Sequence, residues 1–216
     1  DSMVMVRKAI TDLSRTDISI LIQGETGTGK ELAARAIHSL STRSDFPFVP
    51  VDCAAIGESL IESELFGHVK GAFTGAHTST LGLIRSANRG SLFLDEVGEL
   101  SPAIQAKLLR TIQEREVRPV GSSKSYKVDI RILAATNRVL LDDADQGSFR
   151  QDLFYRLNGG TILIPPLRER KSDIPILAEY FLERFNKNFS KSKELTLEVL
   201  LALEGHAWPG NVRELE

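Results

Sequence analysis

Residues 24–30 constrain the fold of this chain more than any other segment. They read GETGTGK, follow a short apolar run and precede a stretch with helical spacing. In this context the pattern G-x-x-x-x-G-K is typical of a phosphate-binding loop between a strand and a helix. The glycines let backbone N–H groups turn towards phosphate oxygens, and the helix N-terminus adds a favourable dipole. The residues expected to line such a site are Gly24, Glu25, Thr26, Gly27, Thr28, Gly29, Lys30 and Glu31.

Two residues of this loop carry separate expectations. The ammonium group of Lys30 would place a positive charge on the β- and γ-phosphates of a nucleotide. The next residue, Glu31, stands where many such loops carry a Ser or Thr that binds magnesium. A magnesium ion would therefore depend more on water, on phosphate oxygens and on a carboxylate from elsewhere in the chain.

An acidic pair ends a second apolar run. Residues 91–96 read SLFLDE, which places Asp95 and Glu96 at the C-terminal end of a strand, the edge where ligands of open α/β sheets bind. Asp95 can hold magnesium, often through water, and Glu96 can polarise the water that attacks a γ-phosphate. The next apolar run leads to Asn137, whose amide could hydrogen-bond the γ-phosphate or that water. An ordinary turn at a strand end would look the same.

Short β-rich runs alternate with helix-length patterns up to residue 164. This alternation predicts an α/β fold with a mainly parallel sheet. The expected strands cover residues 18–22, 48–52, 91–95, 130–136 and 161–164, and the expected helices cover 30–39, 58–66 and 102–115. Ser101 is the expected N-cap of the last of these helices, and Pro102 suits its first turn.

Beyond residue 164 the pattern becomes purely helical. A stiff, charged link, PPLRERK, is followed by expected helices over 173–186 and 196–204 and a third that begins after residue 210 with Asn211 as its cap. We therefore expect a nucleotide-binding α/β subdomain over residues 1–165 and a linker with a small helical subdomain over 166–216. The last helix is expected to continue past residue 216, so further sequence is expected on both sides.

Residues 71–76 read GAFTGA, five small residues around one phenylalanine, Phe73. The segment has neither the alternation of a half-buried strand nor the spacing of an amphipathic helix. It predicts a mobile loop that presents an exposed aromatic side chain, although an ordinary connector would have the same composition.

Composition excludes several classes of protein. A net charge of −2 gives no electrostatic footprint for avid DNA binding by this chain alone. Cys53 is the only cysteine; it fits a reducing cytoplasm and is expected to be a small core residue. The four histidines show no metal-ligand spacing with one another or with Cys53. No apolar run is long enough to cross a membrane, and the first residues show no signal-peptide pattern.

The motifs together resemble one family closely: the AAA+ ATPase domain of bacterial enhancer-binding proteins, which activate sigma-54 RNA polymerase. The matching stretches occur in the family's order along nearly the whole chain. They are GETGTGKE from Gly24, ELFGHVKGAFTGA from Glu64, GSLFLDEVGEL from Gly90, AATNR from Ala134, FRQDLFYRLN from Phe149, PPLRERKSDI from Pro165 and WPGNVRELE from Trp208. The resemblance implies a P-loop NTPase α/β/α sandwich followed by an α-helical lid, here incomplete.

The resemblance also implies a ring of six or seven subunits that hydrolyses ATP, with Mg²⁺, between neighbouring subunits. It assigns Arg150 and Arg156 as candidate fingers that reach the γ-phosphate of a neighbour, a contribution that can be worth about 10³–10⁵ in turnover. Without the resemblance, an amphipathic helix whose arginines are solvated or paired with Asp152 would be the favoured interpretation.

Further roles follow only from the resemblance. Arg213 matches the second sensor, which reports the nucleotide state to the lid, whereas Trp208 is expected to pack inside that lid. Asp52 occupies the position of a switch residue, commonly Asn, that holds the catalytic Glu away from water. A carboxylate there would repel Glu96 unless one of the two is protonated or a water or cation lies between them. A second loop, over about residues 118–126 with its tip at 121–125, is expected beside the GAFTGA loop; an ordinary Ser-rich connector is the alternative.

The function implied is an ATP-driven cycle that raises and lowers the GAFTGA loop against sigma-54 and so opens the promoter complex, in the cytoplasm. The residues expected to bind sigma-54 are Gly71, Ala72, Phe73, Thr74, Gly75 and Ala76. DNA would be bound by a helix-turn-helix domain outside this chain, and a regulatory domain would precede it. Two rival functions are a non-catalytic nucleotide-binding module and a DNA-remodelling AAA+ enzyme such as a helicase or loader.

Overall fold

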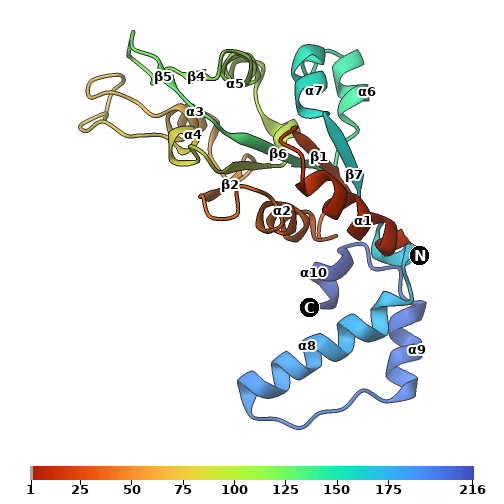
Figure 1. The fold of residues 1–216 in the computed structure, drawn as a ribbon. Helices are drawn as coiled ribbons and strands as arrows, with labels where there is room; N and C mark the ends of the chain where they lie inside the picture. The colour runs from red at the N-terminus through yellow and green to blue at the C-terminus, as the bar shows by residue number, and fades with distance from the viewer. Residues whose placement is uncertain (1) are drawn as a thin grey trace.

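The computed structural model describes residues 2–216, so Asp1, the first residue of the expected α/β subdomain, lies outside the described part. A five-stranded parallel sheet has the strand order β2-β3-β6-β1-β7. Its strands are β1 (Ile20–Gln23), β2 (Phe48–Asp52), β3 (Ser91–Asp95), β6 (Arg131–Thr136) and β7 (Gly160–Leu163). Figure 1 shows the sheet between two layers of helices, with a separate helical region beneath it.

Alternate residues of the strands enter two different cores, because successive side chains of a strand point to opposite faces of the sheet. On β1, Ile20 and Ile22 pack with helices α1 (Ser2–Ser14) and α2 (Lys30–Ser39). Leu21 packs on the other face, with the remaining helices of this part. Those helices are α3 (Glu58–Phe66), α4 (Leu83–Ser86), α5 (Pro102–Glu114), α6 (Leu140–Asp145) and α7 (Gln151–Leu157). The three-layer α/β/α fold expected from the sequence is therefore confirmed.

The parallel register brings the functional strand ends to one edge of the sheet. Asp52 of β2 lies opposite Asp95 of β3, and Gln23 of β1 lies opposite Thr136 of β6. The phosphate loop, the acidic pair and Asn137 each follow one of these strands. Their convergence is a consequence of the parallel topology.

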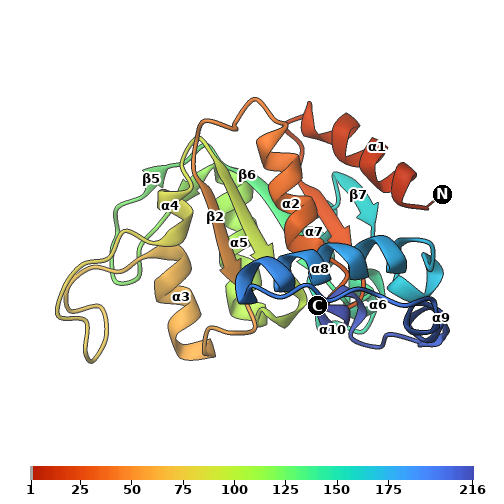
Figure 2. The same ribbon diagram turned by 90° about the horizontal axis from the view of Figure 1, so that it is seen from below.

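Three helices form the second part: α8 (Asp173–Phe189), α9 (Leu197–Gly205) and α10 (Asn211–Leu215), preceded by the 3-10 turn η2 (Leu167–Glu169). Their small core contains Leu167, Ile174 and Trp208, and the indole N–H of Trp208 donates to the Leu203 carbonyl at 2.7 Å. Trp208 is thus a packing residue, as expected. Seen from below, α8 crosses under the sheet, and α9 and α10 lie next to α8 (Figure 2).

Most expected elements are present, with ends that shift by a few residues. The two-residue strands β4 (Glu116–Val117) and β5 (Tyr126–Lys127) and the turn η1 (Val97–Glu99) complete the order. Helices α1, α4 and α6 were not predicted; on α1, Val6 is buried and Met3, Ile10 and Leu13 pack against the same core at helical spacing. Ser101 holds the N-cap position of α5 and Pro102 stands in its first turn, as expected, but the Ser101 side chain makes no cap hydrogen bond. Within residues 2–216, no helix is both long and apolar enough to cross a membrane.

Candidate functional site

The phosphate loop connects β1 to α2, as the sequence predicts. Gly27 and Gly29 have φ values of +79° and +102°, a left-handed region that favours glycine. Lys30 is buried at the first turn of α2, and its Nζ donates to the carbonyls of Gly24 and Glu25 at 3.0 and 3.3 Å. The same ammonium lies 3.3 Å from Oε1 of Glu96. The ammonium group of Lys30 therefore links the phosphate loop to Glu96 of the acidic pair.

The acidic pair extends from the end of β3 towards this lysine. Partial burial raises the pKa of the Asp95 carboxyl; the Glu96 carboxylate raises it further and Lys30 opposes the rise. Glu96 has a left-handed backbone, with φ of +49°, and its Oε2 accepts the N–H of Asn137 at 3.2 Å. An acidic residue with this conformation is uncommon and points to a local constraint.

Asn137 bridges the acidic pair and the phosphate loop. Its backbone N–H binds Glu96, and its side-chain Nδ2 donates to Oγ1 of Thr26 at 3.3 Å. The amide therefore lies between the acidic pair and the phosphate loop, at the strand end expected from the sequence. A contact with a γ-phosphate or an attacking water remains a prediction.

Asp52 lies on the neighbouring strand but turns to its own backbone. Its Oδ1 accepts the N–H groups of Ala54 and Ala55 at 2.9 and 3.0 Å. The next residue, Cys53, is buried in the core as expected, and burial, with the Asp52 carboxylate as the next cause, raises the pKa of its thiol to about 12. The thiol is therefore protonated at neutral pH, and the switch role of Asp52 remains a prediction.

These groups line one cavity of about 610 Å³. Among its lining residues are ten predicted at the site: Thr26, Gly27, Gly29, Lys30, Glu31, Asp52, Asp95, Glu96, Asn137 and Arg213. Gly24 and Glu25 instead border an adjoining hollow of about 680 Å³ between α1, β7 and the linker. Thr28 is buried within the loop, where its hydroxyl donates to the Glu25 carbonyl at 2.8 Å. Arg213 reaches the cavity from α10, so the helical part forms one of its walls.

Asn211 joins the helical part to the phosphate loop through side-chain hydrogen bonds. This residue is fully buried; its Nδ2 donates to Oε2 of Glu25 at 3.1 Å and to the Thr26 carbonyl at 3.0 Å. Its Oδ1 accepts the Leu167 N–H at 2.7 Å. The expectation that Asn211 caps the last helix is wrong: Gly210 holds the cap position, and the Asn211 amide binds the phosphate loop and the linker instead. Only the tertiary contact reveals this role.

Arg168 is a second contact that the sequence did not predict. Its guanidinium binds both carboxylate oxygens of Glu25, at 2.8 and 2.6 Å. The charged linker sequence RER was its only signal. A bidentate contact of this kind fixes the relative orientation of the two side chains as well as pairing their opposite charges.

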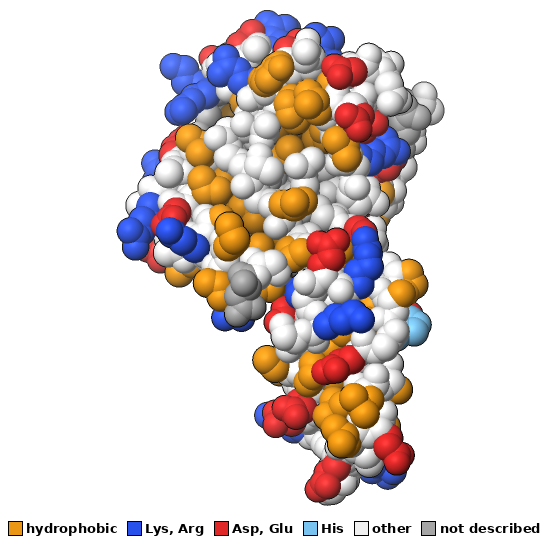
Figure 3. Space-filling model, turned by 90° about the vertical axis from the view of Figure 1, so that its right-hand side faces the viewer, with side chains coloured by type: hydrophobic (Ala, Val, Ile, Leu, Met, Phe, Trp, Pro, Cys, Tyr) orange, Lys and Arg blue, Asp and Glu red, His pale blue; other side chains and the backbone are white. Residues whose placement is uncertain are grey.

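The two candidate finger arginines lie away from this cavity. Arg150 is at the N-terminus of α7 and pairs with Asp152 through 3.0 and 2.8 Å bonds, as the alternative interpretation expected. Arg156 is exposed in the last turn of α7. Neither lines the 610 Å³ cavity. Figure 3 shows hydrophobic side chains gathered on the side that carries α6, α7 and β7, where Val139, Leu141, Tyr155 and Leu163 are exposed.

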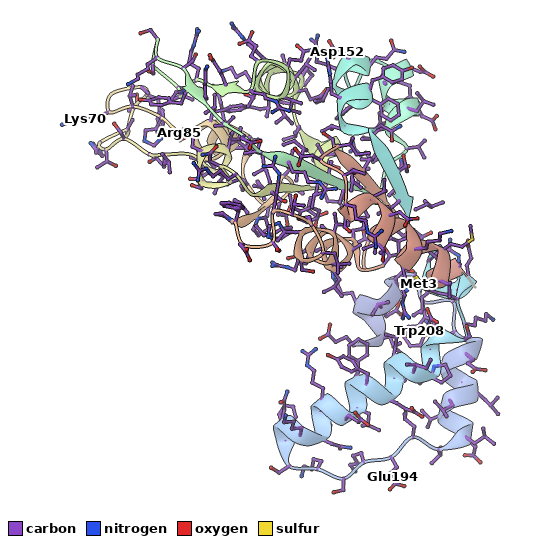
Figure 4. The ribbon with its side chains drawn as sticks, in the orientation of Figure 1. Met3, Lys70, Arg85, Asp152, Glu194 and Trp208 are labelled. Carbon is purple, nitrogen blue, oxygen red and sulfur yellow. The ribbon has the colours of Figure 1, made fainter. Side chains whose placement is uncertain are left out.

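The GAFTGA loop projects between α3 and α4, and the labelled Lys70 marks it far from the body of the sheet (Figure 4). Its base is closed by a hydrogen bond from the Gly71 N–H to the Ala76 carbonyl at 2.9 Å. Phe73 is 43 % exposed, and its ring meets the His68 imidazole edge-on at 5.1 Å between centroids. The expected exposed aromatic residue is present, with one side resting on His68.

The second loop lies against the first, as the resemblance implies. His68 forms a bridge to Thr80 and another to Val120, so its backbone joins the two loops. Gly121 has φ of +76°, and a Cβ at that position would lie 2.7 Å from the Cβ of Ala72. The two loops are therefore in direct contact.

Comparison with known proteins matches this chain to one family. The family model described as the sigma-54 interaction domain matches residues 1–163, and that of the AAA+ ATPase lid domain matches residues 168–216. The transcriptional regulatory protein ZraR of Klebsiella oxytoca is 54% identical over 208 residues, which are 96% of this chain and 47% of that protein. The Nif-specific regulatory protein of Herbaspirillum seropedicae is 55% identical over 199 residues, which are 92% of this chain and 37% of that protein.

Solved structures agree with these matches. NtrX from Brucella abortus in complex with ATP is 36% identical, with a TM-score of 0.91, and the match covers 99% of this chain and 49% of that one. Hsp104 from S. cerevisiae in its ADP complex is 18% identical with a TM-score of 0.63, which shows a shared fold. The chain spans about half the length, or less, of the ZraR and Nif-specific regulatory proteins that it matches.

Proposed function

Because this chain belongs to the sigma-54 interaction domain family of AAA+ proteins, we propose that it hydrolyses ATP in order to remodel sigma-54 RNA polymerase. One observation carries the proposal. The lysine of the phosphate loop, the acidic pair, Asn137 and Arg213 of the lid all line a single cavity. That set contains a phosphate cradle, a carboxylate for a metal, a base for water and a lid residue that can report nucleotide state.

Magnesium fits the carboxylates at this edge of the sheet. Among residues 2–216, no three or more His, Cys, Asp or Glu side chains are grouped to hold a metal ion by themselves. Mg²⁺ usually keeps several waters and takes one or two protein carboxylates together with substrate phosphates. Asp95, beside Lys30 and the phosphate loop, is the residue that would hold it. When bound, the ion would neutralise charge on the phosphates.

Hydrolysis would use Glu96 as the base. The oxygen of a water molecule bonds to the γ-phosphorus, the bond to the β,γ-bridging oxygen breaks, and Glu96 takes the proton released. Its carboxylate is held by Lys30 and by the Asn137 N–H. A γ-phosphate that competes for Lys30 would free Glu96 to contact the water, so substrate binding itself would release the base.

A neighbouring subunit would complete the site. Arg150 and Arg156 lie outside the cavity of their own chain, next to an exposed apolar surface on α6, α7 and β7. An arginine supplied from a neighbour stabilises the charge that develops on the transferred phosphoryl group. A closed ring of six or seven subunits would give every cavity such a partner.

The GAFTGA loop would be the output of this cycle. Contacts to the γ-phosphate order switch segments, and hydrolysis releases them. Residues 71–76 would contact sigma-54 through Phe73 and Thr74 when raised, and Phe73 would rest on His68 when lowered. A sigma-54 partner would place the activity in the bacterial cytoplasm.

Three measurements on purified protein test this function. The ATPase rate per chain should rise steeply with protein concentration, since the site needs two subunits.

Two variants test the roles of single residues. Glu96→Gln should bind ATP but lose turnover, and Thr74→Ala should keep turnover but fail to open sigma-54 promoters. Thr78→Ala, at an exposed residue just outside the hexapeptide, is the matched control. Equal turnover in Glu96→Gln would reject the hydrolysis site, and normal promoter opening by Thr74→Ala would reject the loop role.

A further inference from the structure

Gln105 is a buried amide on the first turns of α5, and every polar atom of its side chain is used. It has no exposed surface. Its Nε2 donates to the carbonyls of Leu100 and Ser148 at 2.7 and 3.2 Å, and its Oε1 accepts the backbone N–H of Arg150 at 2.8 Å. A buried amide is costly unless it is paired, and this one satisfies both of its donor hydrogens and its acceptor.

The two segments that Gln105 joins belong to different catalytic sites. Leu100 ends the short turn that follows Asp95 and Glu96, which serve the subunit's own cavity. Ser148 and Arg150 belong to the segment that starts α7 and carries the arginine expected to serve a neighbour. One side chain therefore fixes the backbone of the donated arginine relative to the acidic pair of the same subunit.

The remaining contacts fix the backbone at Arg150 but hold its guanidinium group only weakly. Phe149 is buried, and the N–H groups of Ser148 and Phe149 donate to the Asp143 carbonyl at 3.0 and 3.1 Å. The guanidinium is held by Asp152 alone among the described residues, in an ion pair whose two side chains are each 46% exposed. Exposed pairs of this kind contribute little free energy, so the tip can exchange Asp152 for a phosphate while the backbone stays in place.

We propose that Gln105 is a positioning residue for the arginine that acts on the neighbouring subunit. The inference rests on the proposed ATPase function and goes beyond it by naming the group that sets the finger's position. The position requires an amide, because the side chain must donate to two carbonyls and accept from one N–H. Misplacing a reacting or stabilising group by about 1 Å can cost about 100-fold in rate.

The first test is a substitution that keeps size and removes the hydrogen bonds. Gln105→Met should lower kcat by about tenfold to 100-fold and leave KM for ATP within about twofold, because the mutant's own phosphate loop is intact. Gln113→Met, at an exposed residue of the same helix, should leave both constants unchanged. An unchanged kcat in folded Gln105→Met would overturn the inference.

The second test asks whether Gln105 acts through Arg150. If it does, Gln105→Met should cause no further loss of kcat in an Arg150→Ala background. A fully additive loss would show a merely structural role and overturn the inference. Normal turnover by Arg150→Ala alone would instead reject the arginine assignment in the proposed function, so the two failures are distinguishable.

The third test asks whether the effect crosses the subunit interface. Gln105→Met subunits have an intact cavity and a misplaced finger, whereas Lys30→Ala subunits have a disabled cavity and an intact finger. Mixed rings should therefore be more active than either variant alone. No recovery would place the effect of Gln105 within its own subunit and overturn the inference. If Gln105→Met does not fold, as judged by thermal unfolding, Gln105→Asn, which keeps the amide but is one methylene too short to reach all three partners, enters the same tests.

Discussion

Glu25 shows how one residue of the phosphate loop serves the surrounding structure. Arg168 binds both of its carboxylate oxygens, and Asn211 donates to one of them. The hydrogen bonds from Arg168, and after them that from Asn211, lower the pKa of Glu25 to about 2. The carboxylate therefore stays charged through the whole physiological range and joins the linker and the lid to the loop.

The lowered pKa of Glu25 predicts a specific pH dependence of stability. A carboxyl group with a lowered pKa in the folded state stabilises the fold above its ordinary pKa of 4.5, and this stabilisation is lost as the pH falls towards 2. Wild type should therefore have a higher Tm than Glu25→Gln at pH 7, and the difference should shrink between pH 4.5 and the acid limit of the fold. Arg168→Gln should show the same pattern in thermal unfolding. A Tm difference that does not change with pH would contradict the ion pair's role.

At the scale of elements, the two projecting loops form one unit. The backbone of His68 bridges to Thr80 on one side and to Val120 on the other. Gly121 packs directly on Ala72, and the ring of Phe73 rests on His68. These contacts connect the GAFTGA hexapeptide to the loop that follows β4, and through β4 to the C-terminal end of α5.

Substitution of Gly121 should uncouple hydrolysis from output. Gly121→Ala adds a Cβ 2.7 Å from that of Ala72 at a φ of +76°, which must displace one loop from the other. We expect the number of promoters opened per ATP hydrolysed to fall about tenfold or more, with ATPase turnover near wild type, because Gly121 does not line the nucleotide cavity.

Gly147→Ala separates backbone strain from contact in this experiment. Its φ of +77° carries the same strain, but a Cβ there would have no neighbour within 4 Å. The ratio of promoters opened to ATP hydrolysed should therefore stay near wild type in this control. Normal coupling in Gly121→Ala would show that the contact between the loops plays no part in output.

At the scale of the whole molecule, the lid is docked on the phosphate loop. The Val212 N–H donates to the Gly27 carbonyl at 3.0 Å, and a Cβ on Gly27 would lie 2.2 Å from the Gly210 carbonyl oxygen. Asn211 lies between these contacts and Arg213 borders the cavity. The position of the lid and the shape of the phosphate loop are therefore set together.

Loss of the Asn211 amide should weaken nucleotide binding. Hydrogen bonds that involve a charged group are worth about 1.5–3 kcal/mol, so Asn211→Ala should raise the Kd for ATP by about tenfold or more and speed hydrogen exchange at the Val212 amide. Asn186→Ala removes an amide that binds Lys193 at the far end of the lid, and it should leave the Kd near wild type. Equal affinity in Asn211→Ala would show that lid docking does not support the loop.

Much of the fold and of the site could be predicted from the sequence. The apolar runs, the glycine pattern at residues 24–30 and the acidic pair at 95–96 are local features, and local propensity and periodicity determine such elements. The parallel topology then requires their strand ends to meet at one edge of the sheet, which is how Lys30, Glu96 and Asn137 come to share a cavity. Chain order and pattern were sufficient for this part.

The tertiary structure alone decided which polar side chains meet across the fold. Arg131 is a charged residue in β6, a strand that was predicted from an apolar run. Its side chain is buried and donates to the carbonyls of Leu13, Ser14 and Ile18 around the end of α1. Gln105 and Asn211 likewise bind partners more than 40 residues away. The physical reason is that a buried polar group must find a partner wherever packing leaves one, and that position depends on how distant elements are arranged. The sequence by itself determined most of the elements and the candidate site residues they carry; the packing decided which amides and arginines hold those residues in place.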